Sequence, residues 1–195
     1  MNATGLDPVL ADSIERYEGA LFRLHDLILG LSEADAHRSP GKGAWSVAQC
    51  LDHLVIAGSL MCVRLDEEIR RARELTRTVK DGRAARLGWF DRLFIAVTAR
   101  GQDGRPPHFR VPHRPPFDPG AGRPIPVLTS QFTALQDRLI TSARSAKGLD
   151  LVDIKVNSIL DPRIKVGLGA WYVAIAGHQE RHLDQAMRAR AALEL

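Results

Sequence analysis

Apolar side chains recur every three or four residues along four long stretches of this chain, the spacing that places them on one face of an α-helix. We expect principal helices over residues 8–30, 47–78, 127–146 and 168–187. A single turn near residues 32–37 and a shorter helical piece over residues 83–100 complete the predicted elements. Four principal helices joined by long connections predict an all-α fold, a four-helix bundle.

Two of the predicted helices begin with a clear capping signal. Asp7 followed by Pro8 supplies an N-cap and a first-turn proline for the first helix. Ser46 and Gln49 have the spacing of a capping box, in which the serine oxygen accepts from the backbone N–H of Gln49 and the glutamine side chain reaches back. We therefore expect Ser46 to be the N-cap of the long second helix.

Residues 105–126 interrupt the helical pattern with eight of the chain's eleven prolines. Proline lacks the backbone N–H that a helix interior needs, so a long irregular connection is predicted there. A surface crossover is the favoured interpretation, with a ligand-binding lid as the alternative, since loops of this length often carry function. We expect His108 and His113, which lie in this connection, to face solvent.

The length of 195 residues and the apolar fraction of 45% are those of one soluble globular domain, which we expect to span residues 1–195. We recognise no signal peptide at the N-terminus and no uninterrupted apolar run long enough to cross a bilayer. A cytoplasmic protein that does not enter a membrane is therefore expected. Cys50 and Cys62 agree with a reducing compartment, because about 18 Å of helix separates them and they cannot pair.

The charge balance argues against a nucleic-acid partner. The net charge of +4 arises from 27 basic and 23 acidic residues, so the basic excess is small. The arginines between residues 64 and 86 look like a basic run until the five acidic residues among them are counted. We expect a solvated, salt-bridged helix face there rather than a nucleic-acid groove.

The candidate chemistry lies in the last predicted helix. His178 and His182 are four residues apart, so they share one helix face and can converge on a single ion. His53 lies beside the apolar stripe of the second helix and is the leading candidate for a third ligand, because helix bundles assemble metal sites from facing helices. A hydrogen-bonded core histidine is the alternative for a lone residue at such a position.

Two further residues could reach the same region, and for both we favour a structural role. Cys50, one turn before His53, is expected to be a small buried apolar residue rather than a ligand. His25 is expected to be a satisfied histidine at the core edge of the first helix rather than a fourth ligand.

Helix phase limits which other residues can reach the predicted metal site. Trp171 lies about two turns before His178 on the same face, so it either walls the pocket or packs in the core. Asp52 and Glu180 differ in phase from the histidines by about a quarter turn or more, and we assign them no catalytic role.

The sequence around these residues resembles that of the DinB-like (YfiT-like) family of metal-binding four-helix bundles. The family pattern combines a Trp-Ser helix start, a His-Leu pair and a late His-x-x-x-His-x-x-Gln run. The matching residues are Trp45, Ser46, His53, Leu54, His178, His182 and Gln185. The resemblance spans nearly the whole chain and implies a divalent ion, commonly zinc or nickel, held by His53, His178 and His182. Residues 83–126 look like an enlarged middle connection, a departure that puts the shape of the pocket entrance in doubt.

Three neutral imidazoles leave the charge of a divalent ion uncompensated, so a bound water or thiol becomes acidic and nucleophilic near neutral pH. The resemblance therefore implies a metal-dependent enzyme of the thiol S-transferase or hydrolase type. Its substrate would be a small molecule, with a low-molecular-weight thiol as cosubstrate in the transferase case. A non-catalytic metal- or small-molecule-binding bundle stays open as the alternative, and a nucleic-acid-binding response protein is a third, disfavoured class. A homodimer rests on the resemblance alone.

Gln185, one turn after His182, is the one candidate for a role beside the ligands. Its side chain could orient a ligand or a water molecule. Helix capping or simple exposure is the alternative.

Overall fold

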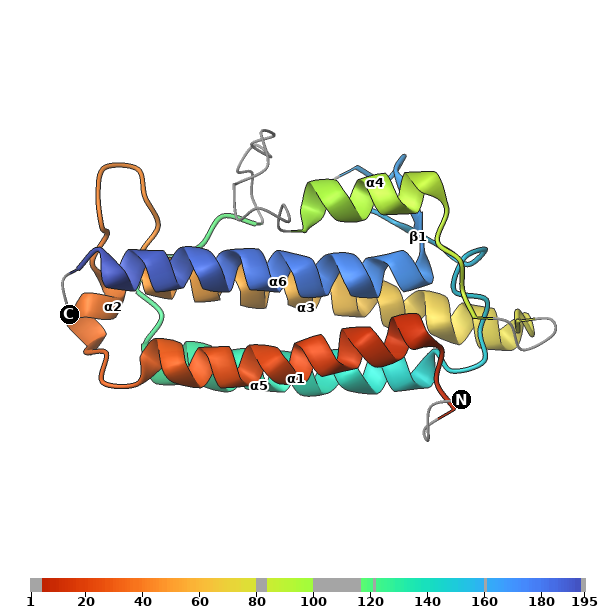
Figure 1. Cartoon of the computed structure of the whole chain (residues 1–195), viewed down its shortest axis with the longest axis horizontal. Coiled ribbons are helices and arrows are strands. Elements are labelled where there is room, and N and C mark those ends of the chain that lie inside the picture. The colour runs from red at the N-terminus through yellow and green to blue at the C-terminus, as the bar shows by residue number, and fades with distance from the viewer. Residues whose placement is uncertain (1–4, 80–83, 100–116, 121, 160, 194–195) are drawn as a thin grey trace.

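Four long helices lie side by side and form the body of the molecule (Figure 1). They are α1 (Pro8–Ile28), α3 (Val47–Glu74), α5 (Ile125–Ser145) and α6 (Leu168–Ala191). Helices α1 and α3 each pack against α5 and α6, so the four enclose a common core. The computed structural model describes residues 5–79, 84–99, 117–120, 122–159 and 161–193. Within these residues the predicted all-α bundle is confirmed.

The capping signals of the first two long helices are present as predicted. The Asp7 carboxylate accepts from the backbone N–H of Val9 at 2.9 Å, and a proline occupies the first turn of α1. At the start of α3, the backbone N–H of Gln49 donates to Ser46 Oγ (3.2 Å), and the backbone N–H of Ser46 donates to Gln49 Oε1 (3.0 Å). The capping box is therefore confirmed, and it fixes where α3 begins.

The end of α3 differs from the prediction. The helix ends at Glu74 rather than near residue 78, because Thr76 adopts a left-handed backbone conformation with φ of +52°. Thr78 instead pairs with Leu149 in an isolated β-bridge. This bridge ties the chain after α3 to the turn after α5.

The start of α5 also differs from the prediction. The helix begins at Ile125, two residues earlier than expected, with Pro126 in the first turn, where no backbone donor is needed. The irregular connection predicted over residues 105–126 is therefore shorter at its end by two residues. Most of that connection, including His108 and His113, lies outside the described residues.

Two short helices accompany the bundle. Helix α2 (Glu33–His37) follows α1 and matches the single turn expected there. Helix α4 (Trp89–Thr98) lies alongside the N-terminal half of α6 (Figure 1). It falls within the piece predicted over residues 83–100 but starts later, after the extended cap residue Gly88.

A two-stranded antiparallel ribbon, which the sequence pattern did not predict, precedes α6. Strands β1 (Lys155–Asn157) and β2 (Lys165–Gly167) place Val156 opposite Val166, and both valines are fully buried. Strands of three residues are too short for an alternating pattern to identify them. Because β2 leads directly into α6, the ribbon fixes where the helix that carries the histidine pair begins.

The apolar core forms two clusters along the bundle. The first contains two fully buried tyrosines: the Tyr17 hydroxyl donates to the backbone oxygen of Tyr172 (2.7 Å), and the Tyr172 hydroxyl pairs with Ser142 (3.0 Å). The second includes Phe132 and Leu183. Both consist mainly of apolar side chains packed on one another, so hydrophobic burial can stabilise a chain of this length without a bound ion.

The charged face predicted for the second long helix is present. Arg70 pairs with Glu74 at 2.7 Å along α3, and Asp66 of the same helix receives Arg138 of α5 at 2.8 Å. These pairs confirm a salt-bridged helix face. That the protein has no nucleic-acid partner stays a prediction.

Among the described residues, α3 is the one helix long and apolar enough to cross a membrane by length and composition. Within its apolar window, 61% of the residues are buried inside the bundle. Core helices of soluble proteins meet the same test, so this property is a weak indication of a membrane span.

Candidate metal centre

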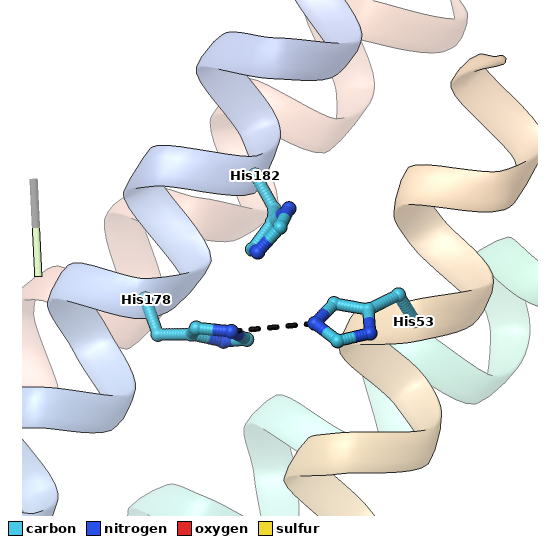
Figure 2. Close-up of side chains that lie close together, drawn as sticks. All are labelled: His53, His178 and His182. Carbon is cyan, nitrogen blue, oxygen red and sulfur yellow. Dashed lines mark hydrogen bonds between the residues drawn. The ribbon is translucent and has the colours of Figure 1, made fainter. Parts of the chain in front are cut away.

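Three imidazole rings meet between α3 and α6 (Figure 2). His53 comes from α3, and His178 and His182 come from consecutive turns of α6, which packs against α3. One ring nitrogen of each lies within 4.8 Å of the others, and the Nε2 atoms of His53 and His178 are 3.3 Å apart. The structure thus brings together the three residues that the sequence analysis selected.

Two of the three rings have their outer nitrogen held by a hydrogen-bond acceptor. His53 Nδ1 lies 2.8 Å from the backbone oxygen of Phe117, and His182 Nδ1 lies 3.0 Å from Gln185 Oε1. A carbonyl or amide oxygen can only accept, so each Nδ1 carries the proton and donates. The Nε2 atoms of His53 and His182 therefore present lone pairs, the tautomer that metal coordination at Nε2 requires.

The distance between two of the ring nitrogens fits a tetrahedral ion. With metal–nitrogen bonds of about 2.0 to 2.1 Å, tetrahedral geometry sets two ligand nitrogens about 3.3 to 3.4 Å apart. The 3.3 Å between the Nε2 atoms of His53 and His178 matches that distance. Three imidazoles are also the donor set of open catalytic zinc sites, so the residues present fit a divalent ion.

The electrostatics of the cluster favour a neutral His178 ring. Burial lowers the pKa of His178 well below its ordinary value of 6.5, and repulsion from His182 and Arg181 lowers it further. A divalent ion binds the neutral imidazole, because protonation occupies the lone pair. His178 therefore meets the charge requirement of a ligand at neutral pH.

Trp45 forms a wall of the cluster, a role that the sequence analysis did not assign to it. Its indole is stacked on His182, with ring centroids 5.7 Å apart and planes 25° apart, and it also contacts His53 at a centroid distance of 5.0 Å. The tryptophan immediately precedes the N-cap Ser46, so the capped start of α3 places its ring against the imidazoles.

Trp171 does not line the cluster. Its ring packs on Phe94 of α4 with centroids 4.7 Å apart, and its Nε1 donates to the backbone oxygen of Val156 at 3.1 Å. The pocket-wall alternative is therefore wrong and the core-packing alternative is confirmed. Sequence spacing placed Trp171 near the phase of His178, but two turns of helix carry it to the neighbourhood of α4 and the ribbon.

Arg181 contacts the cluster directly, a contact that no sequence pattern predicted. Its Nη2 atom lies 3.0 Å from His182 Nε2, the nitrogen that faces the other rings. Burial lowers the pKa of this guanidinium, and none of the acidic groups that the structure describes raises it. As the residue adjacent to His182 it points to a different helix face, and only the length of its side chain allows the contact.

Asp52 supports the segment that orients His53. Its buried carboxylate accepts from the backbone N–H of Gly120 and pairs with Arg123. These contacts fix the chain just after Phe117, whose carbonyl oxygen holds the His53 ring. Asp52 is therefore linked to the His53 ring through the backbone around Phe117 and Gly120. That it has no catalytic role stays a prediction.

Glu180 faces away from the cluster, as its helix phase predicted. Its carboxylate forms a two-point contact with Arg16 of α1, with nitrogen–oxygen distances of 2.7 and 2.8 Å. Cys50 is fully buried in the core, and burial raises the pKa of its thiol to about 12, so its expected role as a small apolar residue is confirmed. The expectation for His25 is wrong: it is exposed on α1, because the neighbouring Leu24 and Leu27 take the core-facing positions.

A surface cavity of about 370 Å³ lies elsewhere, near the ribbon and the end of α3. Its lining includes Arg71, Arg77, Asp153 and Lys155, and none of the three clustered histidines contributes to it. Its mixed charges suit a solvated hollow, and we assign it no role.

A model of the DinB superfamily matches residues 16–186 of the chain. No curated protein and no solved structure matches it. The matched range contains all three histidines of the cluster as well as Trp45 and Gln185.

Proposed function

The chain belongs to the DinB superfamily, and from this premise we propose that it is a metal-dependent enzyme of the thiol S-transferase or hydrolase type acting on a small molecule. His53, His178 and His182 would hold one divalent ion, zinc or nickel. The observation that carries the proposal is the convergence of three imidazoles within 4.8 Å, with no cysteine or carboxylate joining them among the described residues. Three protein ligands with an open fourth position is the pattern of a catalytic zinc site rather than a closed structural one.

A divalent ion held by three neutral imidazoles would acidify a water or thiol that enters its open position. The chain's own residues would orient the ligand nitrogens and exclude water from one side of the site. Phe117 and Gln185 keep protons on the outer nitrogens of two rings, which fixes where the inner nitrogens point. Trp45 covers one side of the rings and excludes water there.

The packing of the bundle supports a catalytic rather than a structural ion. Two apolar clusters run along the helices, and Trp45, which contacts His53 and His182, packs against the second one. A chain of 195 residues with such a core can fold on hydrophobic burial alone. Small domains that depend on a structural ion, by contrast, unfold when it is removed.

A panel of reactions tests the proposal. Zinc- and nickel-loaded protein would be assayed for transfer of low-molecular-weight thiols to electrophilic acceptors, and for hydrolysis of small esters and amides. The matched variants are His182→Ala, which removes a proposed ligand, and His25→Ala, which removes an exposed histidine of α1. We expect turnover in the wild type and His25→Ala and none in His182→Ala.

The same panel separates the two functional classes. Turnover that is equal in His182→Ala and in the wild type would contradict the proposed enzyme. Full metal occupancy with no turnover of any substrate in the panel would favour the alternative, a bundle that binds a metal or a small molecule without catalysis.

A further inference from the structure

Arg181 occupies the lone pair that an ion would use. Its Nη2 lies 3.0 Å from Nε2 of His182, and a guanidinium can only donate, so the imidazole nitrogen is the acceptor. The other nitrogen of that ring already donates to Gln185. One sp² nitrogen has one lone pair, so the hydrogen bond to Arg181 and coordination of an ion at Nε2 exclude each other.

Unlike two nearby arginines, Arg181 has no carboxylate partner among the described residues. Two arginines of α1 that reach α6 both meet carboxylates: Arg16 pairs with Glu180, and Arg23 pairs with Asp184. Within the described part of the chain, Arg181 is partly buried and pairs with no carboxylate. A partly buried cation without a counter-charge is unfavourable, and a divalent ion beside it makes it more so.

We propose that Arg181 is the receptor for a carboxylate group of the substrate, released from His182 when the ion binds and then free to hold the anion next to it. The planar fork of an arginine matches the two oxygens of a carboxylate, and the anion supplies the negative charge that the site otherwise lacks. This inference rests on the proposed function, and it narrows the substrate class to small molecules with a carboxylate near the reacting atom.

The reach of the side chain is consistent with this role. In the present arrangement the guanidinium already touches the ring of a proposed ligand, so it lies beside the position of the proposed ion before it is released. Gln185 continues to hold the opposite side of the His182 ring in both states, so the imidazole itself need not move.

Cobalt(II) provides the probe, because its visible absorption reports a change in the ligands around the ion. The full chain would be loaded with cobalt(II) and titrated with acetate, and in parallel with acetamide, which has a similar shape and no charge. The variants are Arg181→Met, Arg181→Lys and the control Arg188→Met, which removes an exposed arginine of the same helix. Circular dichroism confirms that each variant is folded.

We expect acetate to change the cobalt spectrum of the wild type and Arg188→Met with the same midpoint. In Arg181→Met the midpoint should rise about tenfold or more, as loss of a charge-assisted hydrogen bond predicts. Arg181→Lys, which keeps the charge but not the fork, should lie between them. Acetamide should have little effect on any of the proteins.

A second readout needs no anion. Because Arg181 competes for Nε2 of His182, Arg181→Met should bind cobalt(II) about tenfold more tightly than the wild type when no carboxylate is present. Equal acetate midpoints in the wild type and Arg181→Met, with cobalt bound to both, would overturn the inference and leave the proposed metal site intact. Failure of the wild type to bind cobalt at all would overturn both.

Discussion

His53 Nδ1 lies 2.8 Å from the backbone oxygen of Phe117, a residue 64 positions further along the chain. Asp52, which directly precedes His53 on α3, anchors the segment that follows Phe117 by contacting Gly120 and Arg123. One turn of helix thus supplies both a proposed ligand and the clamp for the carbonyl group that orients it. We expect the end of the connection between α4 and α5 to take part in setting the metal affinity.

Removing the clamp tests this relationship. Asp52→Ala should lower the affinity for zinc roughly tenfold, the lower end of the effect of outer hydrogen-bond partners on metal sites, because the Phe117 carbonyl loses its support. Competition with a chromophoric chelator measures the affinity. The exposed Asp26→Ala is the control on α1. If both variants retain the affinity of the wild type, the carbonyl group is held by other contacts and the clamp is irrelevant to the site.

Gln185 should act through His182 rather than on the ion. Gln185→Ala removes the acceptor for the Nδ1 proton and should weaken zinc binding by about ten- to a hundredfold. Gln185→Glu keeps an acceptor at that position and should retain most of the affinity. Equal losses in both variants would show that the side chain is needed for its packing and not for its hydrogen bond.

Ser46 should stabilise the start of α3 independently of the metal. Ser46→Ala removes the oxygen that accepts from the Gln49 backbone and should lower the free energy of unfolding by about 1 kcal/mol. Urea denaturation of the metal-free protein measures this change. Ser59→Ala, at an exposed position inside the same helix, should leave the free energy nearly unchanged. A loss no larger than in that control would mean that the capping box adds no stability.

Both cysteines should be unreactive in the folded protein. Burial raises the pKa of each thiol to about 12, for Cys50 and for Cys62 alike, so almost no thiolate exists at pH 8. We expect no colour with a thiol-specific disulfide reagent at that pH until denaturant is added, after which both thiols react. Rapid labelling of Cys50 in the native protein would contradict its placement in the core and reopen its candidacy as a ligand.

The parts of the site that sequence could predict are those encoded by regular spacing. The pair His178 and His182 follows from one helical turn, and the capping box of Ser46 and Gln49 follows from a local pattern of four residues. His53 could be placed on the correct helix but was joined to the pair by reasoning about bundles and by resemblance, since long-range contacts leave no local signal.

The features of the site that sequence could not predict are contacts between residues far apart in the chain or on different faces of a helix. A backbone carbonyl such as that of Phe117 has no residue identity to recognise, and the contact of Arg181 depends on a flexible side chain rather than on helix phase. The wrong expectation for His25 and the alternative left open for Trp171 have a related cause. Helical periodicity separates core from surface, but near the edge of an apolar stripe it does not identify the neighbouring element.

X-ray absorption spectroscopy of the zinc-loaded protein tests most directly whether the three histidines bind an ion. We expect one zinc per chain, with nitrogen neighbours at about 2.0 to 2.1 Å and the outer-shell scattering of imidazole rings. His25→Ala should give the same spectrum, and His182→Ala should lose the bound zinc. Zinc held at about 2.3 Å by sulfur, or an unchanged zinc content and spectrum in His182→Ala, would contradict the assignment of His53, His178 and His182 as the metal site.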